Sequence, residues 1–232
     1  AKVAGVIYEA LSDSTAKVTG WEHKSASLSI PSTLKMKGKI RKVVAIAPRA
    51  FAKDDQGSIT DIVLPKYLVE IGEEAFKGSD VTSILMPNTV KSLGTHAFED
   101  CKKLKEVTLS SSLTLIPMAA FRGCDALQEL QVPASVTKIA DLAFEASGLK
   151  EMELPMGVET VGAGAFYNCQ QLEKLAFPNS LKKLGVCCFL YCNKLKSLTL
   201  PDQKPRRMQP SANIDKNLPD DNSLGIKGPA LT

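Results

Sequence analysis

Histidine and tryptophan are scarce in this 232-residue chain, which has two histidines, His23 and His96, and one tryptophan, Trp21. A nucleophile activated by histidine therefore has few possible bases, and we interpret His96 as an exposed turn residue. A glycine-rich phosphate-binding loop is also absent, because the glycines at positions 72, 94, 162 and 185 are spread along the chain. The sequence predicts no catalytic residue, and we expect a protein that is not an enzyme.

Metal-binding patterns are missing as well. Zinc sites commonly use cysteine pairs with two residues between them, and none of the six cysteines is spaced in this way. Cys188 and Cys192 have three residues between them, but they have no second pair and no nearby histidine. We therefore expect no metal and no cofactor.

Long apolar runs and a strong excess of charge are absent too. No apolar run approaches the roughly 20 residues that cross a bilayer, and the segment AKVAGVIYEALSD does not have the basic-then-apolar plan of a signal peptide. On this ground the chain is either cytosolic or mature with its export signal removed. The net charge of +4 is small and the lysines are dispersed, which disfavours nucleic acid as a partner. The composition, 44% apolar and 23% charged, is that of a folded soluble protein.

What the chain does contain is an internal repeat. Phenylalanines recur every 22 to 25 residues, at Phe51, Phe76, Phe98, Phe121, Phe144, Phe166 and Phe189. Such a period over most of the chain is the signature of stacked coils, none of which can bury its apolar face alone. We expect the phenylalanine rings to stack through the middle of the coils.

Each repeat consists of two short sequence motifs, which we call the first and the second phrase. The first, as in residues 149–155, has alternating apolar residues and usually ends in proline, which predicts a short strand. With a partial copy at residues 28–31, eight such strands should stack in parallel. The second phrase, as in residues 68–76, suits a short extended piece and a 3₁₀-like turn. The fold class predicted is a right-handed, β-rich solenoid with a parallel sheet on one side and short 3₁₀ turns on the other.

Three regions follow from the repeat. Residues 1–24 read as a β-hairpin around the turn at 12–15, and we assign it as the N-terminal cap that a solenoid needs over its exposed core. We assign Trp21 to packing within this cap. Residues 25–201 form the solenoid. Residues 202–232, rich in Pro, Asp, Asn and Lys, predict an irregular tail that partly drapes over the last coil.

The turn between each phenylalanine and the next strand has two lengths. Six-residue turns contain a cysteine (Cys101, Cys124, Cys169 and Cys192), and five-residue turns contain Ser79 or Ser147. Cysteines on neighbouring coils could approach disulfide distance. Because their side chains should run parallel, we favour stacked buried thiols instead. The even number of cysteines does not identify the compartment.

The repeat resembles the BspA-type leucine-rich repeat, I-P-x-x-V-x-x-I-G-x-x-A-F-x-x-C-x-x-L-x-x-I-x, over about residues 25–201. The opening GVIYEALSDSTAKVTG also resembles the hairpin that begins many such bacterial proteins. The resemblance implies an exported, cell-surface or lipid-anchored protein that binds other proteins, matrix or neighbouring cells, without catalytic machinery, and we expect an extracellular or cell-surface location. The chain departs from the pattern at nine extra residues between Pro31 and Phe51, at Ser110 in place of proline, and at the pair Cys187-Cys188.

The outward residues of the predicted strands are the candidate partner-binding site. They are Glu106, Thr108, Glu129, Gln131, Glu151 and Glu153, with three glutamates expected in register on successive coils. This stripe is either a solvated sheet face or a binding face for a basic or polyhydroxyl partner. A second patch in the extra residues, Lys35, Lys37, Lys39, Arg41 and Lys42, is either a soluble loop or a grip for anionic glycans or lipid headgroups.

The function expected is a non-catalytic binding scaffold, namely a surface-exposed adhesion or protein–protein interaction module with a protein or extracellular-matrix partner. The alternative is a carbohydrate-binding surface protein that assists polysaccharide capture. Exposed aromatic residues in a row would favour the alternative, but the candidates Tyr67, Tyr167 and Tyr191 lie near turns. We expect membrane attachment only through an anchor that is not in this chain.

Overall fold

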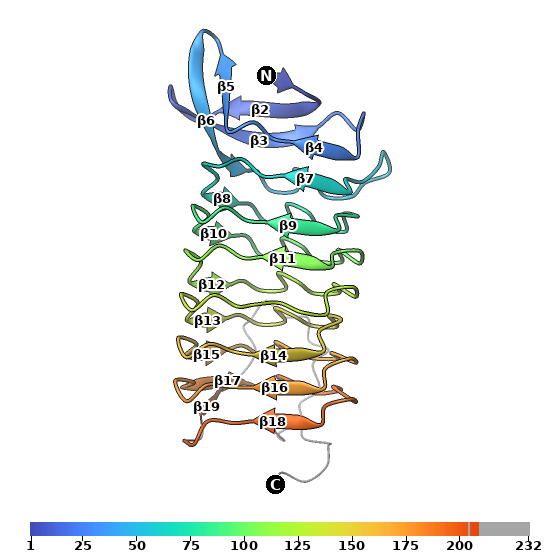
Figure 1. The fold of residues 1–232 in the computed structure, drawn as a ribbon, viewed down its shortest axis with the longest axis vertical. Coiled ribbons are helices and arrows are strands. Elements are labelled where there is room, and N and C mark those ends of the chain that lie inside the picture. The colour runs from blue at the N-terminus through green and yellow to red at the C-terminus, as the bar shows by residue number, and fades with distance from the viewer. Residues whose placement is uncertain (204, 209–232) are drawn as a thin grey trace.

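The first phrase of the repeat folds into short strands. In the computed structural model, which describes residues 1–203 and 205–208, seven three-residue strands lie one above another along a solenoid (Figure 1). They are β4 (Ser27–Ser29), β7 (Asp61–Val63), β9 (Ser83–Leu85), β11 (Glu106–Thr108), β14 (Glu151–Glu153), β16 (Lys174–Ala176) and β18 (Ser197–Thr199). The middle residue of each strand points inward and its neighbours point outward, because successive side chains alternate. We call this side the strand wall.

The strand wall is not one continuous sheet. Pairing joins β4 to β7, β9 to β11, and β14 to β16 and β18. The prediction of an eighth strand in this wall is wrong, because residues 129–131 form no strand. Both β9 and β14 follow a five-residue turn, with Ser79 or Ser147, and neither pairs with a strand of the coil before it. The ladder is interrupted at both places, and also between β11 and residues 129–131, which follow the six-residue turn at Cys124.

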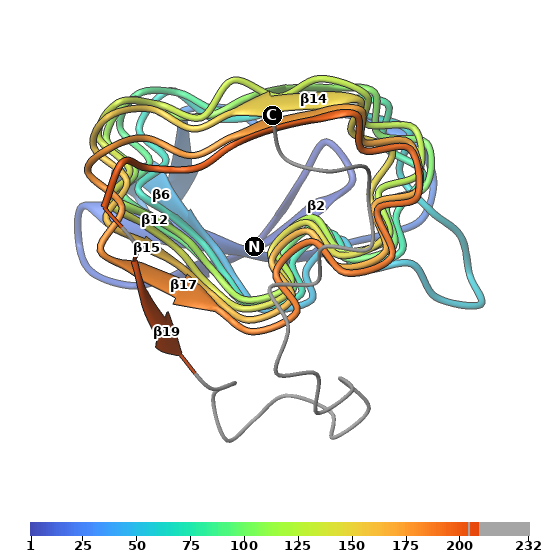
Figure 2. The same ribbon diagram turned by 90° about the horizontal axis from the view of Figure 1, so that it is seen from below.

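A second wall lies opposite the first, and Figure 2 shows the two walls enclosing the core. Its strands are β8 (Glu70–Ile71), β10 (Ser92–Leu93), β12 (Leu115–Ile116), β13 (Lys138–Ile139), β15 (Thr160–Val161), β17 (Lys183–Gly185) and β19 (Arg206–Met208). The structure differs from the predicted irregular tail at β19, because the N–H of Arg206 donates to the Lys182 carbonyl at 2.7 Å and continues the sheet. The rest of that prediction, at residues 204 and 209–232, lies outside the described residues.

The turns that follow the second wall carry i to i+3 hydrogen bonds, as expected for 3₁₀-like turns. Ala75 donates to Gly72 O at 3.3 Å and Lys77 donates to Glu74 O at 3.0 Å. They do not extend into a helix of any kind within residues 1–203 and 205–208. Glu74 has a φ of 51°, and its equivalents in the other coils are left-handed too. Glu74 is the third residue of the first turn and the first residue of the second, and its N–H donates to Thr95 O of the next coil at 2.9 Å.

The phenylalanines form the predicted column through the core. Six rings, from Phe51 to Phe166, stack with centroids 5.0 to 5.7 Å apart and interplanar angles of 19° or less. Phe177 of the strand wall then contacts Phe166 edge-on at 6.5 Å and also contacts Phe189 at 6.3 Å. Burial of these rings removes a large apolar area from water in every coil, which stabilises the stack.

The cysteines form a second buried column beside the rings. All six are free and buried, which confirms thiols rather than disulfides. The Cys101 thiol donates to the carbonyl of Phe76 in the preceding coil at 3.0 Å. The same bond, at 3.0 to 3.2 Å, joins Cys124 to Phe98, Cys169 to Phe144 and Cys192 to Phe166. The six-residue turn thus satisfies a backbone carbonyl inside the core.

Ser110 compensates for the proline that this coil lacks. It is fully buried, its hydroxyl donates to Val90 O at 2.6 Å, and its Oγ accepts from the Ser112 N–H at 3.1 Å. The hydroxyl therefore closes the turn by hydrogen bonding to backbone, a role for which serine is well suited.

The N-terminal cap contains the predicted hairpin and more. Strands β2 (Val6–Ala10) and β3 (Thr15–Trp21) pair antiparallel, with the short β1 (Lys2–Val3) beside β2. The extra residues form a second hairpin from β5 (Thr33–Met36) and β6 (Lys39–Ile46). Because β6 pairs with both β3 and β8, the cap continues the second wall. Trp21 is 7% exposed and packs on His23 with ring centroids 4.1 Å apart, as expected for a packing residue.

Candidate functional site

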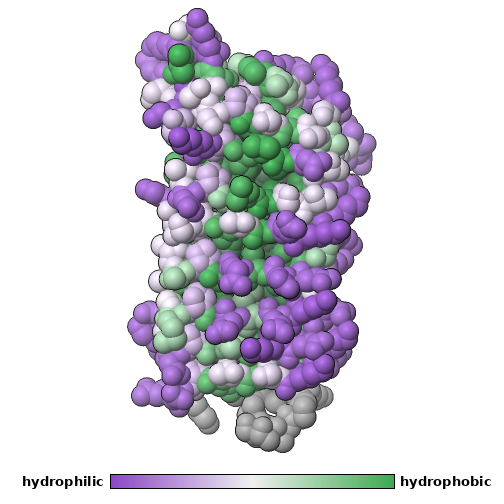
Figure 3. All heavy atoms as spheres, viewed as in Figure 1, coloured by the Kyte–Doolittle hydropathy of each residue, from purple (hydrophilic) through white to green (hydrophobic). Residues whose placement is uncertain are grey.

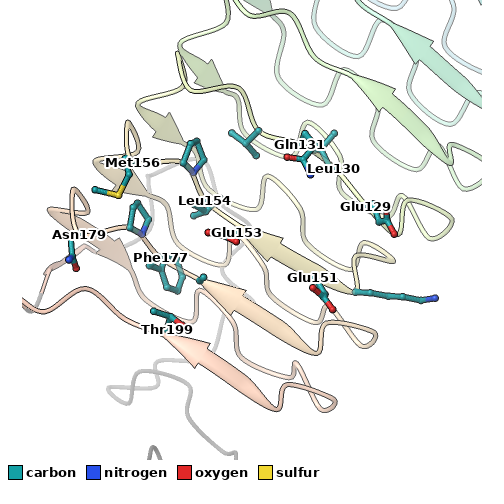
Figure 4. A pocket seen from close by; sticks show the side chains of 15 residues that line it. Glu129, Leu130, Gln131, Glu151, Glu153, Leu154, Met156, Phe177, Asn179 and Thr199 are labelled. Atoms are coloured by element: carbon teal, nitrogen blue, oxygen red, sulfur yellow. The ribbon is translucent and has the colours of Figure 1, made fainter.

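A groove opens on the strand wall where its ladder is interrupted. It has a volume of about 810 Å³ and lies between residues 129–132 of one coil and residues 150–156 of the next, reaching residues 176–179 and 199. Figure 4 shows Glu129 and Gln131 on the first coil, Glu151 and Glu153 on the second, and Met156 toward the other end. We call this the acidic groove.

The groove brings together four of the six residues predicted from sequence. Glu129, Gln131, Glu151 and Glu153 all line it and are all exposed. Glu106 and Thr108 are also exposed, on β11, but they do not line the groove.

The predicted register of three glutamates on successive coils does not form one ladder. Glu106 pairs with Ser83 and Glu151 pairs with Lys174, whereas Glu129 lies in no strand. The three side chains therefore share a wall without being hydrogen-bonded neighbours. The space between Glu129 and Glu151 is part of the groove instead.

The short turn at Ser147 lies directly before the second coil of the groove. The next residue, Gly148, packs so closely on the coil before it that a Cβ there would lie 2.0 Å from Asp125 O. Ser147 itself is buried and its hydroxyl lies 3.5 Å from the Cys169 sulfur. The chain thus enters residues 150–153 from a tightened turn, while residues 129–131 keep the path of the longer turn at Cys124.

The groove has an apolar floor toward one end, beside Glu153 and away from Glu129 and Glu151 (Figure 4). Leu154 and Phe177 are each 3% exposed, whereas Met156 is 68% exposed at one end. Sequence reasoning missed Met156 and Asn179 as lining residues, because both follow the prolines that end the strands. The five-residue turn at Ser147 was the signal that could have located the groove.

The negative charge of the groove is partly countered. Lys150 lines the groove as well, and Lys174 lies beside Glu151 in the pairing of β14 with β16. An opposite charge at a directly paired position lowers the repulsion between carboxylates. The groove therefore retains an excess of carboxylates beside an apolar floor.

The strand wall is more apolar toward the cap. Val63 on β7 is 62% exposed and Leu85 on β9 is 70% exposed, at the positions equivalent to Gln131 and Glu153. Figure 3 shows hydrophobic residues gathered over these strands and more hydrophilic ones toward β14 to β18. One face thus offers an apolar part and an acidic part.

Histidines and tyrosines lie elsewhere. His96 is half-buried rather than exposed as predicted, because its Nδ1 lies 3.1 Å from the buried carboxylate of Glu99. Tyr167 and Tyr191 contact each other edge-on at 5.4 Å, and Tyr67 lies under the ammonium groups of two lysines. None of these side chains lines the acidic groove.

The described part of the chain lacks two further kinds of site. It contains no group of three or more His, Cys, Asp or Glu residues that could hold a metal ion. Nor does any helix in it have the length and apolarity to cross a membrane.

Comparison with known proteins identifies a family. The model of the BspA type leucine-rich repeat region matches residues 44–162 and 114–212 in six copies. No curated protein matches the chain. A leucine-rich repeat protein from Bacteroides ovatus is 27% identical with a TM-score of 0.62, over 86% of this chain and 47% of its own. The chain thus spans about half the length of that protein.

Two further solved structures share the fold. The Treponema pallidum leucine-rich repeat protein is 24% identical with a TM-score of 0.60, over 89% of this chain and 85% of its own. A leucine-rich cell surface protein from Faecalibacterium prausnitzii is 19% identical with a TM-score of 0.61, over 86% of this chain and 72% of its own.

Proposed function

Since the chain belongs to the family of BspA-type leucine-rich repeat proteins, we propose that it is a surface-exposed, non-catalytic scaffold that captures another protein through its strand wall. Leucine-rich repeat proteins of this kind are typically scaffolds without enzymatic activity. The Faecalibacterium prausnitzii relative is described as a cell surface protein, which supports an extracellular or cell-surface location for this chain. An adhesive role toward host or matrix protein is the form of the proposal that we favour.

The acidic groove is the observation that carries the proposal. Exposed Glu129 and Glu151 lie at one end of the groove, and exposed Glu153 lies beside the buried Leu154 and Phe177 toward the other end (Figure 4). A lysine or arginine side chain fits this arrangement, because its charged head pairs with carboxylates while its methylene stem covers apolar surface. The partner we propose is therefore a basic segment of another protein.

The groove favours protein over carbohydrate as the partner. Sugar rings commonly stack on exposed aromatic faces, and the one aromatic residue that lines the groove, Phe177, is 3% exposed. A glycan array beside a binding screen against host matrix proteins separates the two functions.

A direct test uses a labelled peptide of alternating lysine and leucine, with the glutamate–leucine peptide as its opposite-charge counterpart. We expect binding of the basic peptide alone, and a loss of about tenfold or more in affinity for the double variant Glu129→Lys, Glu151→Lys, measured by fluorescence anisotropy. The matched control is Glu70→Lys with Glu73→Lys, two exposed glutamates on and next to the second wall. Equal affinity of the groove variant and the control would overturn the proposal.

A further inference from the structure

The hairpin of β5 and β6 forms a second distinct surface, separate from the acidic groove. It lies at the other end of the solenoid from β18 (Figure 1). Its two-residue loop, Lys37-Gly38, has φ angles of 48° and 79°. Two consecutive left-handed residues form the type of turn whose twist matches that of antiparallel strands. The hairpin is therefore a well-defined arm rather than an irregular loop.

Arg41 does not belong to the exposed basic patch predicted from sequence, and that part of the prediction is wrong. It is 5% exposed, its Nε donates to Ser12 O at 2.8 Å, and its guanidinium also donates to Met36 O. Arg41 points inward because it shares a strand face with the buried Val43. Its bonds fasten the arm to the turn between β2 and β3.

The remaining cations of the patch stay on the outside. Lys35, Lys37 and Lys42 are exposed, as is the neighbouring Lys66, and none of the four forms an ion pair within residues 1–203 and 205–208. Lys42 and Lys66 instead lie 4.8 Å and 5.7 Å from the ring centroid of Tyr67. Lys39 is the exception, since its ammonium lies 2.5 Å from Asp13. The arm thus has a large uncompensated positive charge.

One exposed apolar side chain lies among these cations, and a second lies on the neighbouring turn. Ile40 is 71% exposed and sits directly across the hairpin from Lys35. Leu11, 50% exposed, belongs to the β2–β3 turn that Arg41 fastens to the arm. An exposed isoleucine on a strand gains nothing in water, whereas it is buried when the arm meets an apolar layer.

We propose that this arm docks the protein onto a membrane surface of anionic lipid. Ammonium groups attract the negative headgroups, and Ile40 enters the boundary between headgroups and acyl chains. A soluble anionic polymer would use the lysines but would leave Ile40 without a role. The acidic groove lies on the strand wall toward the opposite end (Figure 1) and stays free for its own partner.

The test is flotation of the whole chain with phosphatidylcholine vesicles, with and without phosphatidylglycerol. We expect flotation only with the anionic vesicles, weakening as salt is raised because the attraction is screened. The double variant Lys35→Gln, Lys37→Gln should lose about tenfold or more in vesicle affinity, and Ile40→Thr should lose several-fold. Lys102→Gln with Lys138→Gln, two exposed lysines on the solenoid, is the matched control and should bind like the parent chain.

Dextran sulfate, an anionic polymer without lipid, distinguishes the alternative. Binding to dextran sulfate together with full vesicle binding by Ile40→Thr would overturn the lipid proposal in favour of a polyanion site. Equal loss in the Lys102 and Lys138 control would overturn any role of the arm. Circular dichroism melting shows that each variant is folded. The groove variant Glu129→Lys, Glu151→Lys should leave flotation intact, so that failure of the groove proposal can be distinguished from failure of the lipid proposal.

Discussion

The ammonium group of Lys77 lies 2.7 Å from a carboxylate oxygen of Glu99 in the next coil, and Glu99 is only 6% exposed. This pair is the centre of a series of ion pairs that runs across the turns: Arg49–Glu74, Glu74–Lys77, Lys77–Glu99, Glu99–Arg122 and Arg122–Glu145. Every pair in this series except Glu74–Lys77 joins one coil to the next. Electrostatic contacts therefore add to the apolar core in holding the stack together.

Replacing Glu99 should destabilise the fold. Glu99→Ala leaves Lys77 and Arg122 without their shared carboxylate, and we expect a loss of about 1–2 kcal/mol in the free energy of unfolding. The loss is smaller than the ~3–5 kcal/mol of a fully buried pair, because the two cations are 35% and 38% exposed. Urea denaturation measures it. Glu73→Ala, at an exposed glutamate of an equivalent turn, is the control, and an equal midpoint for both variants would contradict the prediction.

Acid should weaken the same series of ion pairs. The hydrogen bond from Lys77 holds the pKa of Glu74 below its ordinary value of 4.5, and Arg49 adds to this effect. Because the folded pKa is the lower one, the stabilisation is complete above the ordinary value of 4.5 and is lost as pH falls through the folded value. We expect the melting temperature to drop steeply below about pH 4.5, and less steeply in Glu74→Gln. Identical acid limbs for the two proteins would refute this.

The buried thiols should be unreactive until the chain unfolds. Burial raises the pKa of Cys101 to about 12 and also raises that of Cys124 and Cys188. The thiolate is the nucleophile, so we expect a disulfide reagent to consume no thiol in the native state and all six after denaturation. The raised pKa also means that stability is complete below the unfolded value of about 8.5 and falls as pH rises above it. Rapid reaction of the native protein would contradict the first expectation, and a stability that stays constant above about pH 8.5 would contradict the second.

The sequence predicts the core well because the burial pattern is local and repeated. The position of Phe121 in the ring column and of Cys124 in the thiol column follows from counting along one coil. Such positions need no knowledge of how neighbouring coils are offset. The same holds for the β2–β3 hairpin, whose two strands flank one polar turn.

Features that arise between coils were harder to predict. Glu99 reads as a polar turn residue, and only stacking brings Lys77 and Arg122 to it from the two adjacent coils. Four of the six predicted site residues line a groove, but the groove itself lies between residues 129–132 and the following coils, and hydrophobic periodicity does not show how far neighbouring coils are separated. Arg41, in contrast, was within reach of sequence reasoning, because strand alternation places it on the same face as Val43.

The close packing of Gly148 links the fold to the groove, and a single methyl group tests that link. In Gly148→Ala the new Cβ would lie 2.0 Å from Asp125 O and 2.8 Å from its carbonyl carbon, so the backbone must move. We expect a loss of about 1–3 kcal/mol in the free energy of unfolding, as for other overpacked sites, measured by urea denaturation. Gly20→Ala is the control, because the nearest atom to its new Cβ is 3.9 Å away. Since Gly148 leads directly into Lys150 and Glu151, the variant should also weaken binding of the basic peptide. Unchanged stability and unchanged peptide affinity would show that the short turn does not shape the groove.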